Sequence, residues 1–121
     1  QLRISPWFRL SPLFLAANGI SRNARMSAIR IGDLVLIGFP GDLSGEISAS
    51  LRAWAGDRGV TFVTTSFSGT YQGYISPDAY YGELHDDGSL AYETGIMSWT
   101  GPAQERFFTG LATSMIERLD P

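Results

Sequence analysis

An apolar run over residues 34–39, ended by the turn-forming stretch Pro40-Gly41-Asp42, most constrains the fold of this chain. Between Ser44 and about Asp57, apolar residues then recur at helical spacing, and Gly59 predicts the end of that helix. Val60 to Phe67 is rich in β-branched and aromatic residues, as strands are. This order predicts a β-α-β crossover, and the wholly apolar first strand favours a sheet covered on both faces.

Two further elements complete the predicted fold. Ser27 to Ile31 and the apolar run flank Gly32-Asp33, which is typical of a two-residue hairpin turn. Near the C-terminus, Gly101-Pro102 opens a helix. Its expected buried stripe consists of Phe107, Phe108, Leu111, Ala112, Met115 and Leu119. We therefore expect residues 1–121 to form one α/β unit: a β-hairpin plus a β-α-β unit, closed by a C-terminal helix.

Shorter elements are expected between these main ones. Ser11-Pro12 is a plausible cap and first position of a short helix that ends at Asn18-Gly19. Pro77 to Tyr81 is expected to begin another short helix, and the polar stretch His85 to Ser89 to form a loop.

Composition excludes several functional classes. The chain has 121 residues and 44% hydrophobic content, enough for one domain with a real core. Nine arginines, no lysine and a net charge of -3 give no basic field for nucleic acid. Cysteine is absent, which excludes disulfides and thiolate metal sites. The longest apolar stretches are far below the roughly 20 residues that a transmembrane helix needs.

The first twenty residues are unusually apolar, with Trp7, Phe8, Leu13 and Phe14 among them. One interpretation is a processed product that lost its leader. Another is that these side chains pack against polypeptide outside this chain. The second interpretation predicts that the chain self-associates or binds a companion through this segment.

Several familiar catalytic patterns do not fit. A zinc hydrolase normally uses three protein ligands, and His85 is the sole histidine, beside two aspartates in a loop typical of a solvated turn. In Gly41-Asp42-Leu43-Ser44-Gly45 the serine comes one place too late for a nucleophile elbow. Ser66 and Ser68 have no evident base and are interpreted as ordinary strand-end serines.

Two turns carry the candidate chemistry. Asp42 follows the first strand of the crossover, and the tyrosine-rich stretch Gly69 to Pro77 follows the second. These positions favour a common cleft, where α/β proteins place ligands. An aspartate before a helix commonly caps it, and tyrosines such as Tyr74 and Tyr92 commonly pack at strand ends, so structural roles stay open for all three residues.

The order of four short motifs resembles the neutral (non-lysosomal) ceramidase family. The motifs are Pro40-Gly41-Asp42, Gly69-Thr70-Tyr71-Gln72-Gly73-Tyr74, Asp78-Ala79-Tyr80 and Tyr92-Glu93. The family has a Pro-Gly-Glu turn, an Asn-x-Tyr-x-x-Tyr-like turn, a Glu-Glu-Tyr-like segment and a Tyr-Glu pair in that order. The resemblance covers roughly residues 29–118.

The resemblance implies part of a zinc amidohydrolase that cleaves the amide of ceramide or a related lipid. Asp42 falls where the family has its zinc-binding glutamate, and Tyr74 where it has its zinc-binding tyrosine. Tyr92 falls where a tyrosine stabilises the developing oxyanion. The resemblance also implies a secreted or periplasmic parent enzyme, of which this chain is the C-terminal part of the catalytic domain.

Three features differ from the family pattern. Aspartate replaces glutamate at position 42, the interval from Tyr74 to Tyr92 is longer through Gly82 to Ser89, and the family's two zinc-binding histidines lie upstream of the matched region. We therefore expect this chain to hold half of an active site and to be inactive alone. It would need the upstream part of the domain or a companion chain.

Two other functions stay open. One is a small non-catalytic α/β module that binds a partner through Trp7, Phe8, Leu13 and Phe14. The other is a ceramidase-like paralogue with a changed or lost metal site and a different amide substrate.

Overall fold

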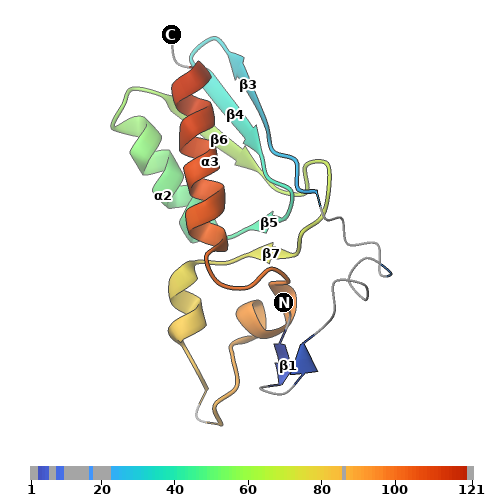
Figure 1. Cartoon of the computed structure of the whole chain (residues 1–121). Helices are drawn as coiled ribbons and strands as arrows, with labels where there is room; N and C mark the ends of the chain where they lie inside the picture. Colours follow the sequence, from blue (N-terminus) through green and yellow to red (C-terminus); the bar gives the residue numbers. More distant parts are fainter. Residues whose placement is uncertain (1–2, 6–7, 10–16, 18–22, 86, 120–121) are drawn as a thin grey trace.

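The computed structural model describes residues 3–5, 8–9, 17, 23–85 and 87–119 (Figure 1). Within them the strands are β1 (Arg3–Ser5), β2 (Phe8–Arg9), β3 (Ser27–Ile31), β4 (Leu34–Gly38), β5 (Asp42–Leu43), β6 (Thr61–Thr65) and β7 (Tyr74–Ile75). The helices are α2 (Gly45–Gly56) and α3 (Gln104–Leu119), with a 3-10 segment η1 (Asp78–Gly82) and a single π-helical turn η2 (Glu93–Met97).

The predicted hairpin and crossover are both confirmed. β3 pairs antiparallel with β4 through the turn at Gly32, whose φ of +60° suits a glycine. β4 pairs in parallel with β6, and α2 makes the connection between them. The sheet order is therefore β3-β4-β6 (Figure 1).

Helix α2 begins with a serine cap. The Ser44 Oγ accepts a hydrogen bond from the backbone N–H of Glu46 at 3.3 Å. Ser44, and not Asp42, is therefore the residue that caps the helix. The helix buries Ile47, Leu51 and Ala55, and the chain turns away at Gly59, which has a φ of +73°. This glycine lies where the sequence predicts the end of the helix.

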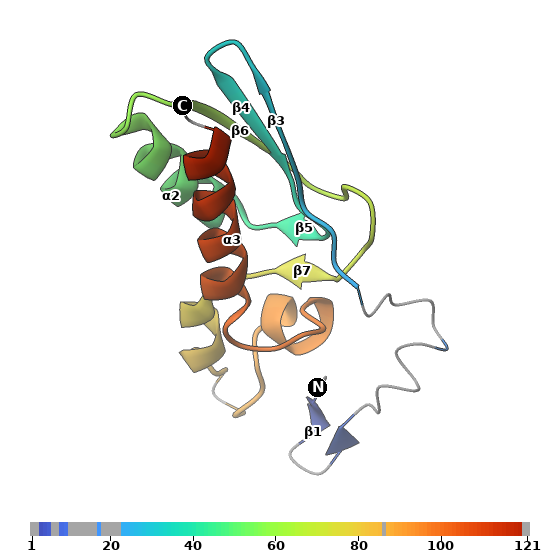
Figure 2. The ribbon, with the colours of Figure 1, turned by 45° about the horizontal axis from the view of Figure 1, so that its top comes forward.

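Helices α2 and α3 cover one face of the sheet (Figures 1 and 2). The core between them centres on Phe39, which is fully buried and meets Phe108 of α3 edge-to-face, with 6.5 Å between ring centroids. Buried apolar residues from β4, β6, β7 and both helices surround this pair, among them Val35, Ile37, Leu51, Phe62, Ile75, Ala112 and Ile116.

The prediction that the sheet is covered on both faces is wrong for the described residues. Ile29 and Leu36 are register partners, as are Leu36 and Val63, so these three side chains form a row across the sheet. Ile29 and Val63 are exposed, as is Ile31 at the next position of the same face. An apolar strand run indicates burial, but it does not say what supplies the second layer.

The expected stripe of α3 is partly wrong. Phe108 and Ala112 are buried as predicted, and they continue to Ile116, which the predicted stripe omits. Phe107 and Leu111 are exposed instead. The buried residues are spaced by four along the helix, so the row that meets the sheet is narrower than the apolar stripe in the sequence.

Part of the prediction for the N-terminus lies outside the described residues. This holds for the helix expected after Ser11, apart from Ala17, and for Trp7, Leu13 and Phe14. The expected short helix after Pro77 is confirmed as η1. Within the described residues, no helix has the length and apolar character to cross a membrane.

Phe39→Ala is expected to lower the free energy of unfolding by about 3–5 kcal/mol, because it removes a fully buried ring and leaves a cavity beside Phe108. Urea denaturation followed by circular dichroism measures this change. Phe107→Ala is the matched control, since that ring is 59% exposed and its loss should change stability by about 0.5 kcal/mol or less. Equal losses in the two variants would contradict the assigned core.

Candidate functional site

The candidate site is built on a short parallel ladder between β5 and β7. Asp42 is the register partner of Tyr74, and Leu43 is the partner of Ile75. The Asp42 N–H donates to the Gly73 carbonyl at 3.0 Å. Leu43 and Ile75 are buried on one side, so the alternation of side chains places Asp42 and Tyr74, both half-buried, together on the other. The two predicted metal ligands are therefore neighbours.

Two glycines allow this close approach. A Cβ at Gly41 would lie 2.5 Å from the Gly73 carbonyl oxygen, so a side chain there would push the ladder apart. Gly73 has a φ of +82°, and a Cβ on it would lie 2.7 Å from the Met97 carbonyl oxygen and 3.0 Å from the Trp99 ring. Gly73 also pairs with Ser98 in an antiparallel bridge, which fastens the segment after η2 beside β7.

The loop after β6 holds the backbone on both sides of Asp42. The Phe67 N–H donates to the Gly41 carbonyl at 3.0 Å, and the Leu43 N–H donates to the Ser66 Oγ at 3.0 Å. Ser66 thus supports the ladder through its hydroxyl. Ser68 Oγ lies 2.9 Å from Thr65 Oγ1, within hydrogen-bond distance. Both serines have the structural role expected of strand-end residues.

A tyrosine–carboxylate pair lies at the start of α2, and the sequence analysis missed it. The Tyr80 hydroxyl of η1 donates to Glu46 Oε1 at 2.7 Å. This hydrogen bond, with the negative charge of Glu46, raises the pKa of Tyr80 to about 12, and Tyr74 contributes to the shift. Glu46 is exposed on α2, and its partner is 34 residues away in the sequence. Helical spacing carries no signal for such a pair.

Tyr92 is placed apart from the Asp42–Tyr74 pair. It lies at the N-terminal end of η2 and is 60% exposed. No hydrogen bond or ring contact recorded for the described residues joins it to Asp42 or Tyr74. Because η2 contacts β7, Tyr92 lies on a segment that neighbours the β5–β7 ladder.

The segment between η1 and η2 forms the polar loop that the sequence predicts. An antiparallel bridge between Leu84 and Leu90 closes the loop, and the His85 N–H donates to the Ser89 carbonyl at 2.8 Å. The His85 side chain is exposed. Hydrogen bonds from the Ser89 hydroxyl and N–H lower the pKa of Asp87.

Asp78 connects η1 to the start of α3. Its Oδ1 accepts the Ala103 N–H at 2.8 Å, while the Asp78 N–H donates to Glu105 Oε2 at 2.7 Å. These reciprocal bonds satisfy backbone donors at the beginning of both helices. The Asp78-Ala79-Tyr80 segment thus fixes the position of η1, at one end against α3 and at the other against Glu46 of α2.

The donor set fits part of a zinc site. Asp42 offers a carboxylate and Tyr74 a phenol oxygen on one side of the ladder. Among the described residues, no group of three or more histidine, cysteine, aspartate or glutamate side chains could hold a metal ion. Zinc in proteins takes three or four protein ligands. The described residues therefore place two candidate oxygen ligands side by side and do not form a complete metal site by themselves.

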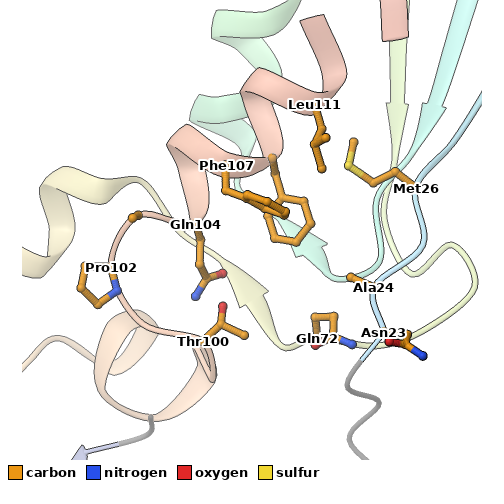
Figure 3. A pocket seen from close by; sticks show the side chains of 11 residues that line it. Asn23, Ala24, Met26, Gln72, Thr100, Pro102, Gln104, Phe107 and Leu111 are labelled. Carbon is orange, nitrogen blue, oxygen red and sulfur yellow. The ribbon is translucent and has the colours of Figure 1, made fainter. Parts of the chain in front are cut away.

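A hollow of about 550 Å³ lies apart from this pair (Figure 3). It opens between the first turns of α3 and the chain before β3, where Phe107, Leu111 and Met26 line it. Gln104 lines its floor and is held by a hydrogen bond from its Nε2 to Ser98 Oγ. Neither Asp42 nor Tyr74 lines this hollow.

Comparison of the chain with protein-family models, with curated proteins and with solved structures finds no match.

Gly73→Ala is expected to destabilise the fold by at least about 2 kcal/mol, because the added Cβ overlaps the Met97 carbonyl and the Trp99 ring. Gly88→Ala is the matched control: its φ of +78° is similar, yet no atom lies within 4 Å of the added Cβ. The control should lose only about 1 kcal/mol, from the left-handed backbone. Urea denaturation compares the two variants, and an equal loss would show that the packing at Gly73 is not tight.

Glu46→Gln is expected to lower the pKa of Tyr80 from about 12 toward the ordinary value of 10.0. Since the folded-state pKa is raised, the stabilisation from this pair is fully present below pH 10 and is lost as the pH rises through about 12. An ultraviolet titration of tyrosinate measures the shift, with Tyr80→Phe assigning the signal. Glu83→Gln is the control, because Glu83 acts on Tyr80 only through its charge. An unchanged titration in Glu46→Gln would contradict the pair.

Proposed function

We propose that this chain supplies half of the active site of a zinc-dependent amidohydrolase resembling neutral ceramidase. The observation that carries the proposal is the register pairing of Asp42 with Tyr74, which gathers on one ladder the two residues that match the family's metal ligands. The substrate class is an N-acyl lipid amide, such as ceramide. By the same resemblance, the complete enzyme would be secreted or periplasmic.

In this proposal the residues of the β5–β7 ladder bind the metal, and other side chains contact the substrate. The Asp42 carboxylate and the Tyr74 phenol oxygen are the two ligands that this chain provides. When bound, zinc supplies polarisation of the amide carbonyl and activation of water. The exposed Tyr92 hydroxyl would donate a hydrogen bond to the charge that develops on the carbonyl oxygen. Glu46 and Tyr80 would position η1, and with it the end of β7.

The remaining ligands are proposed to be histidines from the upstream part of the same domain or from a companion chain. Two oxygen donors fall short of the three or four ligands that zinc takes, so the isolated chain should not catalyse amide cleavage. Asp42 is also one methylene shorter than glutamate. Its position in a strand directly beside Tyr74 supports a role at the same ion.

Specific observations favour the two alternatives. A non-catalytic partner-binding module is supported by the apolar row on one sheet face, where Ile29 and Val63 are exposed among the described residues. A paralogue with an altered metal site and another amide substrate is supported by aspartate in place of glutamate at position 42. Zinc binding at Asp42 and Tyr74 argues against the module and leaves substrate choice to be tested separately.

Metal titration tests the proposed half-site. Cobalt(II) in place of zinc gives a visible absorption band that reports its ligands, and imidazole in the buffer stands in for the missing histidines. We expect the 121-residue chain to bind cobalt weakly, and zinc to displace it. Asp42→Asn and Tyr74→Phe should each weaken binding about tenfold or more, because each removes one of two protein ligands.

Asp33→Asn serves as the control, since Asp33 is an exposed carboxylate in the turn between β3 and β4. It should bind cobalt as the unmodified chain does. The proposal is overturned if Asp42→Asn and Tyr74→Phe bind as tightly as this control, or if the isolated chain hydrolyses ceramide. Native mass spectrometry before and after denaturation adds a direct readout of any companion chain and of zinc lost on unfolding.

A further inference from the structure

Three aromatic rings form a ladder that leads from β7 to solvent. The Trp99 ring packs against Gly73, and Tyr71 meets Trp99 edge-to-face with 4.9 Å between ring centroids. Phe67 stacks on Tyr71, with 5.4 Å between centroids and an interplanar angle of 20°. Exposure increases outward: Trp99 is half-buried, Tyr71 is 36% exposed and Phe67 is 62% exposed. We call Phe67, Tyr71 and Trp99 the aromatic ladder.

The outermost ring, that of Phe67, is exposed to solvent on a residue with a strained backbone conformation. Phe67 has a φ of +57°, a left-handed conformation that is unusual for a bulky residue and costs about 1–3 kcal/mol. Hydrogen bonds from Phe67 to Gly41 and from Leu43 to Ser66 fix this part of the loop. The protein thus maintains a strained residue whose apolar ring contributes little to the core. Such strain is commonly maintained at functional positions.

The stretches of sequence that carry the three rings contain no charged residue, and the carboxylate next to the hydrogen bonds of this loop is that of Asp42, between Gly41 and Leu43. Residues 59–77, which include Phe67 and Tyr71, contain no aspartate, glutamate, lysine or arginine, and neither do residues 94–104 around Trp99. The whole chain is acidic, with a net charge of -3. Within these stretches a nucleic acid, an anionic membrane or an acidic protein surface would find no basic side chain to pair with.

We propose that the aromatic ladder docks onto a zwitterionic lipid surface. Phe67 would enter the acyl region, while Tyr71, with its apolar ring and polar hydroxyl, suits the headgroup boundary. The strength of interfacial binding scales with the apolar area buried, to which attraction between basic residues and anionic lipids can add. On a zwitterionic surface the apolar contribution is the main one. The inference rests on the proposed function for its substrate, since a lipid amide resides in a bilayer. Because the loop of Phe67 also holds Gly41 and Leu43, docking would bring the Asp42–Tyr74 ladder to the lipid surface.

Vesicle flotation tests the proposal with the full chain and phosphatidylcholine vesicles. Phe67→Asn removes the ring but keeps a residue that tolerates positive φ, so the loop should retain its shape. We expect this variant to reduce vesicle partitioning about tenfold or more, the effect of losing one buried aromatic side chain. Raising the salt concentration or adding anionic lipid should not strengthen binding.

Phe107→Asn is the matched control, because Phe107 is 59% exposed but belongs to α3 and not to the aromatic ladder. It should partition within about twofold of the unmodified chain, and thermal melting should confirm that both variants fold. No vesicle binding by the unmodified chain, or equal losses in the two variants, would overturn the proposal. Self-association that Phe67→Asn abolishes, seen by sedimentation without lipid, would overturn it in favour of a protein contact.

Cobalt binding separates this inference from the proposed function. Phe67→Asn should bind cobalt normally while it loses vesicle binding. Asp42→Asn should bind vesicles normally while it loses the metal. If both cobalt and vesicle binding are lost in Phe67→Asn, its ring supports the fold of the site, and the docking role is contradicted.

Discussion

The parallel pairing of Asp42–Leu43 with Tyr74–Ile75 is the contact on which the candidate site depends. Each short strand continues the chain beyond the main sheet, so a local hydrogen-bonded ladder fixes two polar side chains that are far apart in sequence. The buried side of the same ladder contributes Leu43 and Ile75 to the core. Folding and site geometry therefore share one element, and a change that loosens the core at Ile75 would also move Tyr74.

Much of the fold could be predicted because its signals are local. Apolar spacing marks α2 and α3, and the dipeptide at Gly32 marks the hairpin. The face that α3 buries could not be predicted in the same way. Phe107 and Phe108 are equally apolar, and only the packing of the helix against β3 and β4 decides that the second is buried. Likewise, the apolar character of β4 could not show that, in the described part of the chain, Ile29, Ile31 and Val63 on one face of the sheet are exposed.

The candidate site was partly predictable for a related reason. Strand order and turn position suggested that the turns of Asp42 and Tyr74 would face one cleft, and the register places the two residues side by side on a short ladder. The bond between Glu46 and Tyr80 depends on where η1 lies after β7, which no spacing in the sequence encodes. The left-handed backbone of Phe67 was also missed, because its residue type favours a strand there.

The antiparallel bridge between Leu84 and Leu90 closes the loop between them, so the length of this loop is independent of the positions of η1 and η2. The two ends of the loop are held next to each other, so residues can be added or removed between them without altering where η1 ends or η2 begins. The number of residues between Tyr74 and Tyr92 can then vary with little effect on where either tyrosine lies. The same loop offers an attachment point for a fluorophore or an affinity tag, remote from the packed face of the sheet.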